Sequence, residues 1–407
     1  MKYTFYAFFF SLIFISCSAP ELPPPPPPIT IAEVEQRFEY FATLEFDEDR
    51  YDYISDFLDS LKFADQFPII EDSTVLFVHF GFVKEVEWIG DFNNWGEDDS
   101  INSQGVQTGK SGLWTWKTTF PNDARFDYKI SIDNELAIVD PFNRKKQRSE
   151  SSENSVLEMP DWERDPIVYT RREVNRGDVS GNKIIESSPL QQALRYWVYT
   201  PDGYTNMDEL PVVYVTDGQA YTNNQIGNMP AILDNLIADG AIEPTIAVFI
   251  DSRDPNDRLY NLKGQLLSGN TDFANFLIEE LVPLIDEQYK TSTSANDRAI
   301  MGTTLGGLNA TYLAFTSPQT FGKVGSQSPA YWYKSDIYDI VENSSATGLS
   351  VFLSSGTYYD GIEDTQKMQA LMSSKGHSVN LVTVNEGASW GAWRSQIDDI
   401  LIQFFGK

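Results

Sequence analysis

The sequence of 407 residues predicts an α/β fold with a mostly parallel sheet, preceded by a β-sandwich and a short helical segment. Strand-like and helix-like stretches alternate from about residue 166 onward, which is typical of a parallel sheet covered on both faces. Residues 73–147 instead contain short runs of alternating apolar and polar residues between Gly, Asn and Asp turns. Residues 31–72 carry apolar side chains at helical spacing.

Residues 1–17 predict an export signal. Met1-Lys2 precede an apolar run over residues 5–15, which is too short to span a bilayer and is typical of a signal peptide. Residues 14–17 read Phe-Ile-Ser-Cys and are similar to a bacterial lipobox. This predicts a lipid anchor on Cys17, the single cysteine of the chain, and a location in the bacterial cell envelope at the outer membrane. An ordinary cleaved signal with an incidental cysteine is the alternative.

Between this signal and the first strands we expect a spacer and a helical hairpin. Residues 18–30 include six consecutive prolines, Pro23–Pro28, which favour a stiff polyproline II linker. Residues 31–72 carry 13 acidic and three basic side chains, and their apolar positions predict helices that pack on the next domain. The acidic face is either solvated or a docking surface for a protein partner.

The charge of the chain excludes some classes of partner. The net charge is −29, from 59 acidic and 30 basic residues. Because such a surface lacks the excess Lys and Arg that neutralise phosphates, we expect no nucleic-acid partner. Attraction to anionic lipid is equally disfavoured, so the expected membrane contact rests on the Cys17 anchor. No motif indicates a metal or another cofactor.

Residues 73–147 are predicted to form a β-sandwich of about seven short strands. Four segments carry a specific resemblance: Gly90–Trp95, Gly112–Trp116, Tyr128–Asp133 and Asp140–Asn143. They resemble the early-set sandwich of family-48 carbohydrate-binding modules, and this resemblance implies that Trp95 stacks on sugar rings with the help of Lys129. Leu136 and Asn134 depart from the family's pattern, so packing of Trp95 within the sandwich is the alternative.

A polar linker is expected at 148–165, followed by the α/β domain at 166–407. The predicted strands cover residues 181–187, 193–200, 211–217, 245–251, 297–302, 321–326, 350–355 and 378–385. The predicted helices cover residues 227–239, 271–290, 305–315, 363–375 and 390–405. In a sheet of this kind the functional site lies at the carboxyl ends of the strands.

The most informative motif is Gly302-Thr303-Thr304-Leu305-Gly306, at the predicted junction of a strand and a helix. This context matches the G-x-S-x-G turn that presents a nucleophilic serine, but Thr304 occupies the position of the serine. A β-branched residue is disfavoured in that strained turn, and its methyl group would crowd an attacked carbonyl. The N–H of Leu305 and that of Gly218, in the Asp217-Gly218-Gln219 loop, are expected to form an oxyanion hole.

From about residue 193 to 405 the chain resembles the esterase D and enterochelin-esterase-like branch of α/β-hydrolases, which includes acetylxylan and feruloyl esterases. The resemblance rests on the turn around Thr304 and on residues 210–219, 258–260, 280–289, 328–332 and 387–393. It implies an α/β-hydrolase fold with a catalytic histidine in a G-H-S/D-W pattern before the last helix. This chain has Ala388 at that position, and Asp360 matches the family's acid.

The chain contains two histidines that could replace the missing base. We expect His79 within the sandwich and His377 at the amino-terminal edge of the sheet, so neither is expected to reach Thr304. Removal of a triad member lowers the rate roughly 10⁴- to 10⁶-fold, and here both nucleophile and base are altered.

Three functions remain as hypotheses. The first is a non-hydrolytic, lipid-anchored relative of esterases that binds an acylated or glycan ligand in an aromatic pocket. Its predicted lining is Tyr221, Tyr331, Trp332, Tyr333, Trp390 and Trp393, with core packing as the alternative role. The second is a carboxylesterase that uses Thr304 with an unconventional base. The third is an assembly subunit that docks through the acidic segment and the sandwich.

Overall fold

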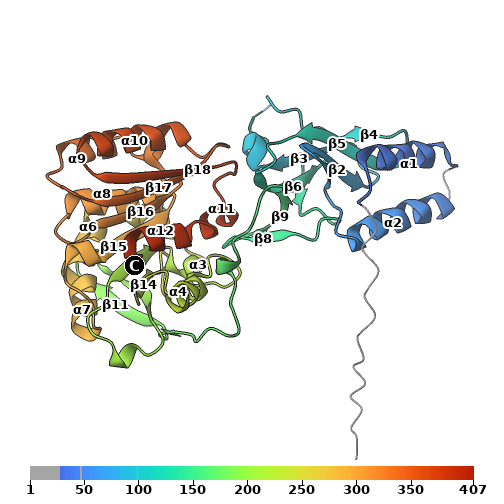
Figure 1. Cartoon of the computed structure of the whole chain (residues 1–407). Coiled ribbons are helices and arrows are strands. Elements are labelled where there is room, and N and C mark those ends of the chain that lie inside the picture. Colours follow the sequence, from blue (N-terminus) through green and yellow to red (C-terminus); the bar gives the residue numbers. More distant parts are fainter. Residues whose placement is uncertain (1–27, 46–47, 99) are drawn as a thin grey trace, which may run out of the picture.

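The structure is a computed structural model that describes residues 28–45, 48–98 and 100–407. The predicted signal, Cys17 and most of the proline run therefore lie outside the described residues. Figure 1 shows a helical hairpin at one end, antiparallel sheets in the middle and an α/β unit at the other end. Within the described ranges, no helix is both long enough and apolar enough to cross a membrane.

The hairpin consists of α1 (Ile31–Thr43) and α2 (Glu48–Phe63). A capping box starts α1: the Thr30 hydroxyl accepts from the Glu33 N–H at 3.2 Å, and the Glu33 carboxylate accepts from the Thr30 N–H at 2.9 Å. The buried side of both helices packs against Leu76 and Val78 of the next sheet. The predicted helical hairpin is therefore present, and it covers the outer face of that sheet.

Two antiparallel sheets follow, with strand orders β1-β2-β5-β4 and β3-β6-β9-β8, and β7 beside β6. The strands are β1 (Ile69–Glu71), β2 (Thr74–Phe80), β3 (Val86–Gly90), β4 (Val106–Gln107), β5 (Leu113–Thr119), β6 (Arg125–Ile132), β7 (Leu136–Ile138), β8 (Lys146–Arg148) and β9 (Glu153–Glu158). Phe77, Trp88 and Tyr128 from both sheets share one aromatic core. This arrangement is consistent with the predicted β-sandwich. We call residues 69–158 the two-sheet unit.

Two predicted boundaries are wrong. Strand β1 lies inside the segment that we expected to be helical, and β9 lies inside the expected linker at 148–165. The polar residues of β9 misled the prediction because their side chains are buried with partners that lie far away in the sequence. Asn154 donates to Asp127 at 3.1 Å, and the Ser155 hydroxyl accepts from the Asp140 N–H at 2.8 Å.

The α/β unit is built on one mixed sheet with the order β10-β12-β14-β13-β15-β16-β17-β18, and β11 beside β12. Its strands are β10 (Asp178–Val179), β11 (Lys183–Ser187), β12 (Gln192–Thr200), β13 (Val212–Thr216), β14 (Ile246–Ile250), β15 (Arg298–Thr303), β16 (Lys323–Gln327), β17 (Ser350–Gly356) and β18 (Ser378–Val384). The strands from β14 to β18 run parallel, whereas β10, β11 and β12 are antiparallel. All eight predicted strands are confirmed within about two residues.

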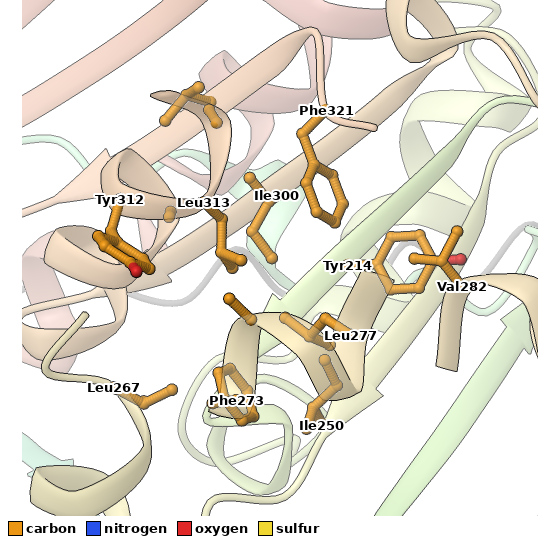
Figure 2. Packing of buried hydrophobic residues seen from close by; sticks show 14 of the residues in the cluster. Tyr214, Ile250, Leu267, Phe273, Leu277, Val282, Ile300, Tyr312, Leu313 and Phe321 are labelled. Carbon is orange, nitrogen blue, oxygen red and sulfur yellow. The ribbon is translucent and has the colours of Figure 1, made fainter. Parts of the chain in front are cut away.

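Helices cover both faces of this sheet, as predicted. One face packs on α5 (Lys263–Leu266), α6 (Thr271–Asn275), α7 (Val282–Gln288), α8 (Leu305–Thr316), α9 (Ile337–Asn343) and α10 (Ile362–Ser374). The other face packs on α3 (Gly218–Tyr221), α4 (Met229–Ala238), α11 (Trp390–Arg394) and α12 (Ile397–Phe405). Figure 2 shows Tyr214 and Ile300 of the sheet directed toward Leu277, Leu313 and Phe321 in the first of these cores.

Candidate functional site

The turn between β15 and α8 retains the geometry of a nucleophile elbow around Thr304. Its backbone has φ 52° and ψ −114°, a region that is costly for a β-branched residue, by about 1–3 kcal/mol. The Thr304 N–H donates to the Gln327 carbonyl at 2.9 Å, and the Thr304 carbonyl accepts from the Ala330 N–H at 3.1 Å. A Cβ on Gly302 or Gly306 would lie 2.2 or 2.5 Å from the Thr216 hydroxyl. The two hydrogen bonds hold the strained turn in place, and Thr216 leaves no room for a side chain at either glycine.

The two predicted oxyanion donors lie at the same edge of the sheet. Leu305 begins α8 after β15, and Gly218 begins α3 after β13, the strand paired in parallel with β15. Backbone N–H groups in the first turn of a helix have no intrahelical partner. The N–H groups of Leu305 and Gly218 are therefore not used in helical hydrogen bonds. Beside them, the Asp217 carboxylate accepts from the Ser252 hydroxyl and pairs with Lys263, each at 2.5 Å.

No histidine occupies the base position. Ala388 follows β18 and is exposed. His377 precedes β18, where its ring packs edge-to-face against Phe315 and its Nδ1 accepts from the Leu349 N–H at 3.2 Å. His79 is buried in β2, within the two-sheet unit. The structure therefore places both histidines of the chain away from the elbow, as expected from the sequence.

The acid position is occupied by a protonatable carboxyl group with unexpected partners. Asp360 lies in the loop after β17 and is 8% exposed. Its Oδ2 accepts from the Ser328 hydroxyl at 2.6 Å and from the Gly356 N–H at 2.5 Å. The Trp393 indole in turn donates to the Ser328 hydroxyl at 2.7 Å. Burial raises the pKa of Asp360 to about 6, although these hydrogen bonds lower it.

A cavity of about 240 Å³, which we call the junction cavity, opens where the two-sheet unit meets the α/β unit. It is lined by Asp91, Trp95, Asp127, Arg148, Ser149, Glu150, Ser151, Asn154, Lys263, Ala388, Ser389, Trp390 and Trp393. The structure therefore brings Trp95 and Trp390, predicted as separate ligand contacts, to one site. Trp95 is 38% exposed and lies outside the aromatic core of its unit.

The other predicted ligand residues lie elsewhere. The prediction of Tyr221 and Tyr331 as pocket residues is wrong: both are fully buried, and their hydroxyls bond Gln327 and Thr311 at 2.8 and 2.7 Å. Trp332 is 69% exposed and does not line the junction cavity. Lys129 is half-buried on β6 and is also absent from that lining.

The hairpin turn after β8 contributes residues that the sequence did not single out. Glu150 accepts from the Gln219 side chain at 2.6 Å, and Gln219 also donates to the Ser252 hydroxyl at 3.1 Å. Burial and the nearby Asp217 raise the pKa of Glu150. The turn thus connects the junction cavity to the oxyanion loop. Its sequence, rich in Ser and Glu, carried only the signal of a linker.

A buried ion cluster holds the loop that carries Ala388 against the two-sheet unit. Arg125 of β6 is fully buried and pairs with Asp127 at 2.7 Å and with Glu386 at 3.5 Å. Its guanidinium also donates to the Ser389 hydroxyl at 3.1 Å. Asp91 lies beside this cluster, and burial and the neighbouring Asp127 raise the pKa of its carboxyl group well above the ordinary value.

Several known proteins match this chain. The family model described as "Putative esterase" matches residues 187–404, more than half of the chain. An endo-1,4-β-xylanase/feruloyl esterase of Xylanibacter ruminicola is 30% identical over 240 residues, and an iron(III) enterobactin esterase of Escherichia coli is 29% identical over 201 residues. These matches cover 56% and 48% of this chain. The chain spans 32% and 47% of the length of the two relatives.

Solved structures extend the likeness beyond the α/β unit. The ferric enterobactin esterase of Salmonella typhimurium superposes with a TM-score of 0.70 at 20% identity, over 81% of this chain and 93% of that chain. An enterobactin esterase from Shigella flexneri gives 0.68 at 22% identity, over 81% and 92%. At such identities the likeness shows the fold alone. Because 81% of the chain exceeds the α/β unit, the shared fold includes part of the two-sheet unit.

Proposed function

The chain belongs to the esterase family that its residues 187–404 match, and from that premise we propose that it binds a glycan or acylated ligand without hydrolysing it. The observation that carries this proposal is Ala388, a methyl group at the position of the base, in the wall of the junction cavity. An acyl transfer at a hydroxyl needs a base within hydrogen-bond reach. Neither His79 nor His377 provides one.

The surroundings of Asp360 support the same conclusion. In a working triad the acid orients the imidazole, yet here its Oδ2 is occupied by Ser328 and Gly356. Ser328 also accepts from Trp393, so this acid group stabilises the wall of the junction cavity.

The junction cavity has the chemistry of a site for a polyhydroxylated ring. Trp95, Trp390 and Trp393 offer flat apolar surface, and Ser149, Glu150 and Asn154 offer hydrogen-bonding groups. The Asn154 Oδ1 is buried without a hydrogen-bond partner among the described residues. At about 240 Å³ the cavity lies below the usual range for drug-sized ligands, which suits one sugar ring or one acyl group.

We further propose that acylation of Cys17 anchors the protein at the outer membrane of the cell envelope. The lipobox-like residues 14–17 and the proline run that follows support this location. A stiff spacer would hold the ligand site away from the bilayer.

A binding series tests the ligand proposal. Xylohexaose, maltohexaose and a feruloylated arabinoxylan oligosaccharide are titrated into the protein by calorimetry. We expect saturable binding of one of them, weakened about tenfold or more in Trp95→Ala because a stacking surface is lost. Trp332→Ala, which removes an exposed tryptophan outside the cavity, is the control and should bind normally. Absence of saturable binding for the whole series would contradict the proposal.

A second candidate is an active carboxylesterase that uses Thr304, and the retained elbow geometry favours it. Turnover of acetyl and feruloyl esters by the wild type is compared with Thr304→Ala. Equal background rates eliminate this candidate, whereas a loss of roughly 10³-fold or more would establish Thr304 as the nucleophile. In the repaired variant Thr304→Ser with Ala388→His, new esterase activity would show that the oxyanion donors remain usable.

A further inference from the structure

A second cavity, of about 330 Å³, lies between the edge of the two-sheet unit and the segment that leads into the α/β unit. We call it the basic cavity, because its charged lining is Lys145, Lys146, Arg164 and Glu158. Three cations around one carboxylate leave a net charge of plus two, in a chain with a net charge of −29. The basic cavity shares no lining residue with the junction cavity.

One carboxylate serves two of these cations. Glu158 Oε2 lies 2.9 Å from the Lys145 ammonium, and its Oε1 lies 2.9 Å from the Arg164 guanidinium. The Lys146 ammonium instead donates to neutral oxygens, the Asp140 carbonyl at 2.7 Å and the Ser155 hydroxyl at 2.9 Å. In the described part of the chain no carboxylate lies within ion-pair distance of Lys146. Lys146 therefore has no direct ion pair; partial burial lowers its pKa, although the charges of the nearby Asp140 and Glu153 raise it.

A fourth cation adds to the positive potential of this region. The Arg394 guanidinium lies 5.6 Å from the ring centre of Tyr169, which lines the basic cavity. The Tyr169 hydroxyl accepts from Arg164 at 3.0 Å. Burial and the charge of Arg164 lower the pKa of Arg394. Cations that repel one another in a half-buried site are costly to hold together, and a bound anion would remove that cost.

We propose that the basic cavity binds a phosphate monoester. Such a group carries a charge close to −2 at neutral pH and three acceptor oxygens, which matches the net charge of the lining and its convergent donors. A single carboxylate would leave one charge of the lining unbalanced. The volume of about 330 Å³ leaves room beyond the phosphate for a small polar group attached to it. This site is separate from the proposed ligand site and does not depend on it.

The phosphate group has two possible sources, a soluble sugar phosphate or the headgroup of a phospholipid. Glucose 6-phosphate is titrated into the full-length protein by calorimetry, with glucose as the uncharged comparison. Flotation with vesicles of phosphatidic acid in phosphatidylcholine, against phosphatidylcholine alone, tests the lipid source. We expect saturable binding of glucose 6-phosphate that weakens as salt rises, and none of glucose. Vesicle binding by that same site would identify the lipid as a further source.

Two variants, one that removes a positive charge and one that removes a negative charge, distinguish an anion site from a purely structural ion cluster. Lys145→Gln removes one cation from a partly exposed position and should weaken glucose 6-phosphate binding about three- to tenfold. Glu158→Gln removes the competing carboxylate and should tighten binding by a similar factor, while its amide oxygen can still accept from Arg164. A cluster that serves stability alone would not give this tightening.

Lys84→Gln, the same change at an exposed lysine outside the cavity, is the control and should leave binding unchanged. Circular dichroism of each variant establishes that it is folded. The proposal is overturned if the wild type shows no saturable binding of glucose 6-phosphate at millimolar concentration. It is equally overturned if Lys145→Gln and Glu158→Gln change the affinity in the same direction.

Discussion

Asp360, which the family resemblance places at the position of the catalytic acid, is held by neighbours within the fold. It lies after β17, and its Oδ2 accepts from the Ser328 hydroxyl and the Gly356 N–H. Burial disfavours the charged form of this carboxyl group and raises the pKa of Asp360 to about 6. The residue therefore links the stability of the fold to pH.

The direction of the Asp360 pKa shift determines how the stability of the fold changes with pH. The folded state holds the Asp360 proton more tightly than the unfolded chain, where the pKa is near 3.8. The stabilisation that protonated Asp360 gives to the folded state is therefore fully present at low pH. It is lost as the pH rises from about 4 to about 6, and the loss is at most about 3 kcal/mol. In Asp360→Asn this decline should disappear. Urea unfolding at pH 4, 5, 6 and 7 measures it, and an unchanged pH slope in the variant would refute the assignment.

Residue identity predicted the strained backbone at Thr304 but not the contacts around Asp360. The assignment of Thr304 and Ala388 to the nucleophile and base positions remains a prediction from the sequence. The hydrogen bond from Ser328 to Asp360 could not be predicted, because it joins loops after two different strands. The burial of Tyr221 could not be predicted either, because the local sequence does not indicate whether an aromatic side chain near a site points into a pocket or into the core.

At the scale of elements, the loop from β18 to α11 depends on two glycines that face the two-sheet unit. A Cβ on Gly387 would lie 2.5 Å from the Asp91 carboxyl carbon. A Cβ on Gly391 would lie 1.9 Å from the Arg125 guanidinium carbon. Local backbone geometry explains neither glycine, because neither Gly387 nor Gly391 has a positive φ. Gly391 even lies within α11, where glycine is unfavourable. The requirement comes from the opposing unit.

This contact makes a prediction that runs against helix propensity. Alanine is favoured over glycine within a helix by about 1 kcal/mol, so propensity alone would have Gly391→Ala stabilise the fold. The clash with buried Arg125 should prevail and destabilise the protein by about 1–3 kcal/mol. Gly264→Ala in α5 is the matched control, because nothing lies within 4 Å of its added methyl group. Thermal unfolding should show a lower Tm for the first variant only.

Elements with strong periodicity were the ones that the sequence predicted well. The eight strands predicted in the α/β unit and the helical hairpin carry apolar residues at regular spacing, and all are present, whereas the short strand β10 was not predicted. Strand β9 was missed because its Asn154 and Ser155 are polar yet buried. A strand whose inward side chains are satisfied by distant partners looks like a linker until those partners are known.

At the scale of the whole molecule, the two units meet through charge as well as apolar packing. Arg125 of the two-sheet unit pairs with Asp127 in its own strand and with Glu386 across the junction. The Trp162 indole donates to Glu386 at 3.0 Å, so the connecting segment joins the same cluster. A single guanidinium thus balances carboxylates from both units, which predicts that the units unfold together.

Arg125→Leu tests that coupling. The change leaves Asp127 and Glu386 buried without their cation, which should cost about 3–5 kcal/mol and separate one calorimetric transition into two. The loss should be larger at pH 8 than at pH 5, because burial raises the pKa of Glu386 and its protonation at the lower pH relieves the unpaired charge. Arg195→Leu is the control: Arg195 is equally buried but pairs with Asp251 inside the α/β unit. That variant should lose stability within one unit and leave the junction intact. Two transitions in the wild type, or one in Arg125→Leu at pH 8, would show that the charge cluster does not couple the units.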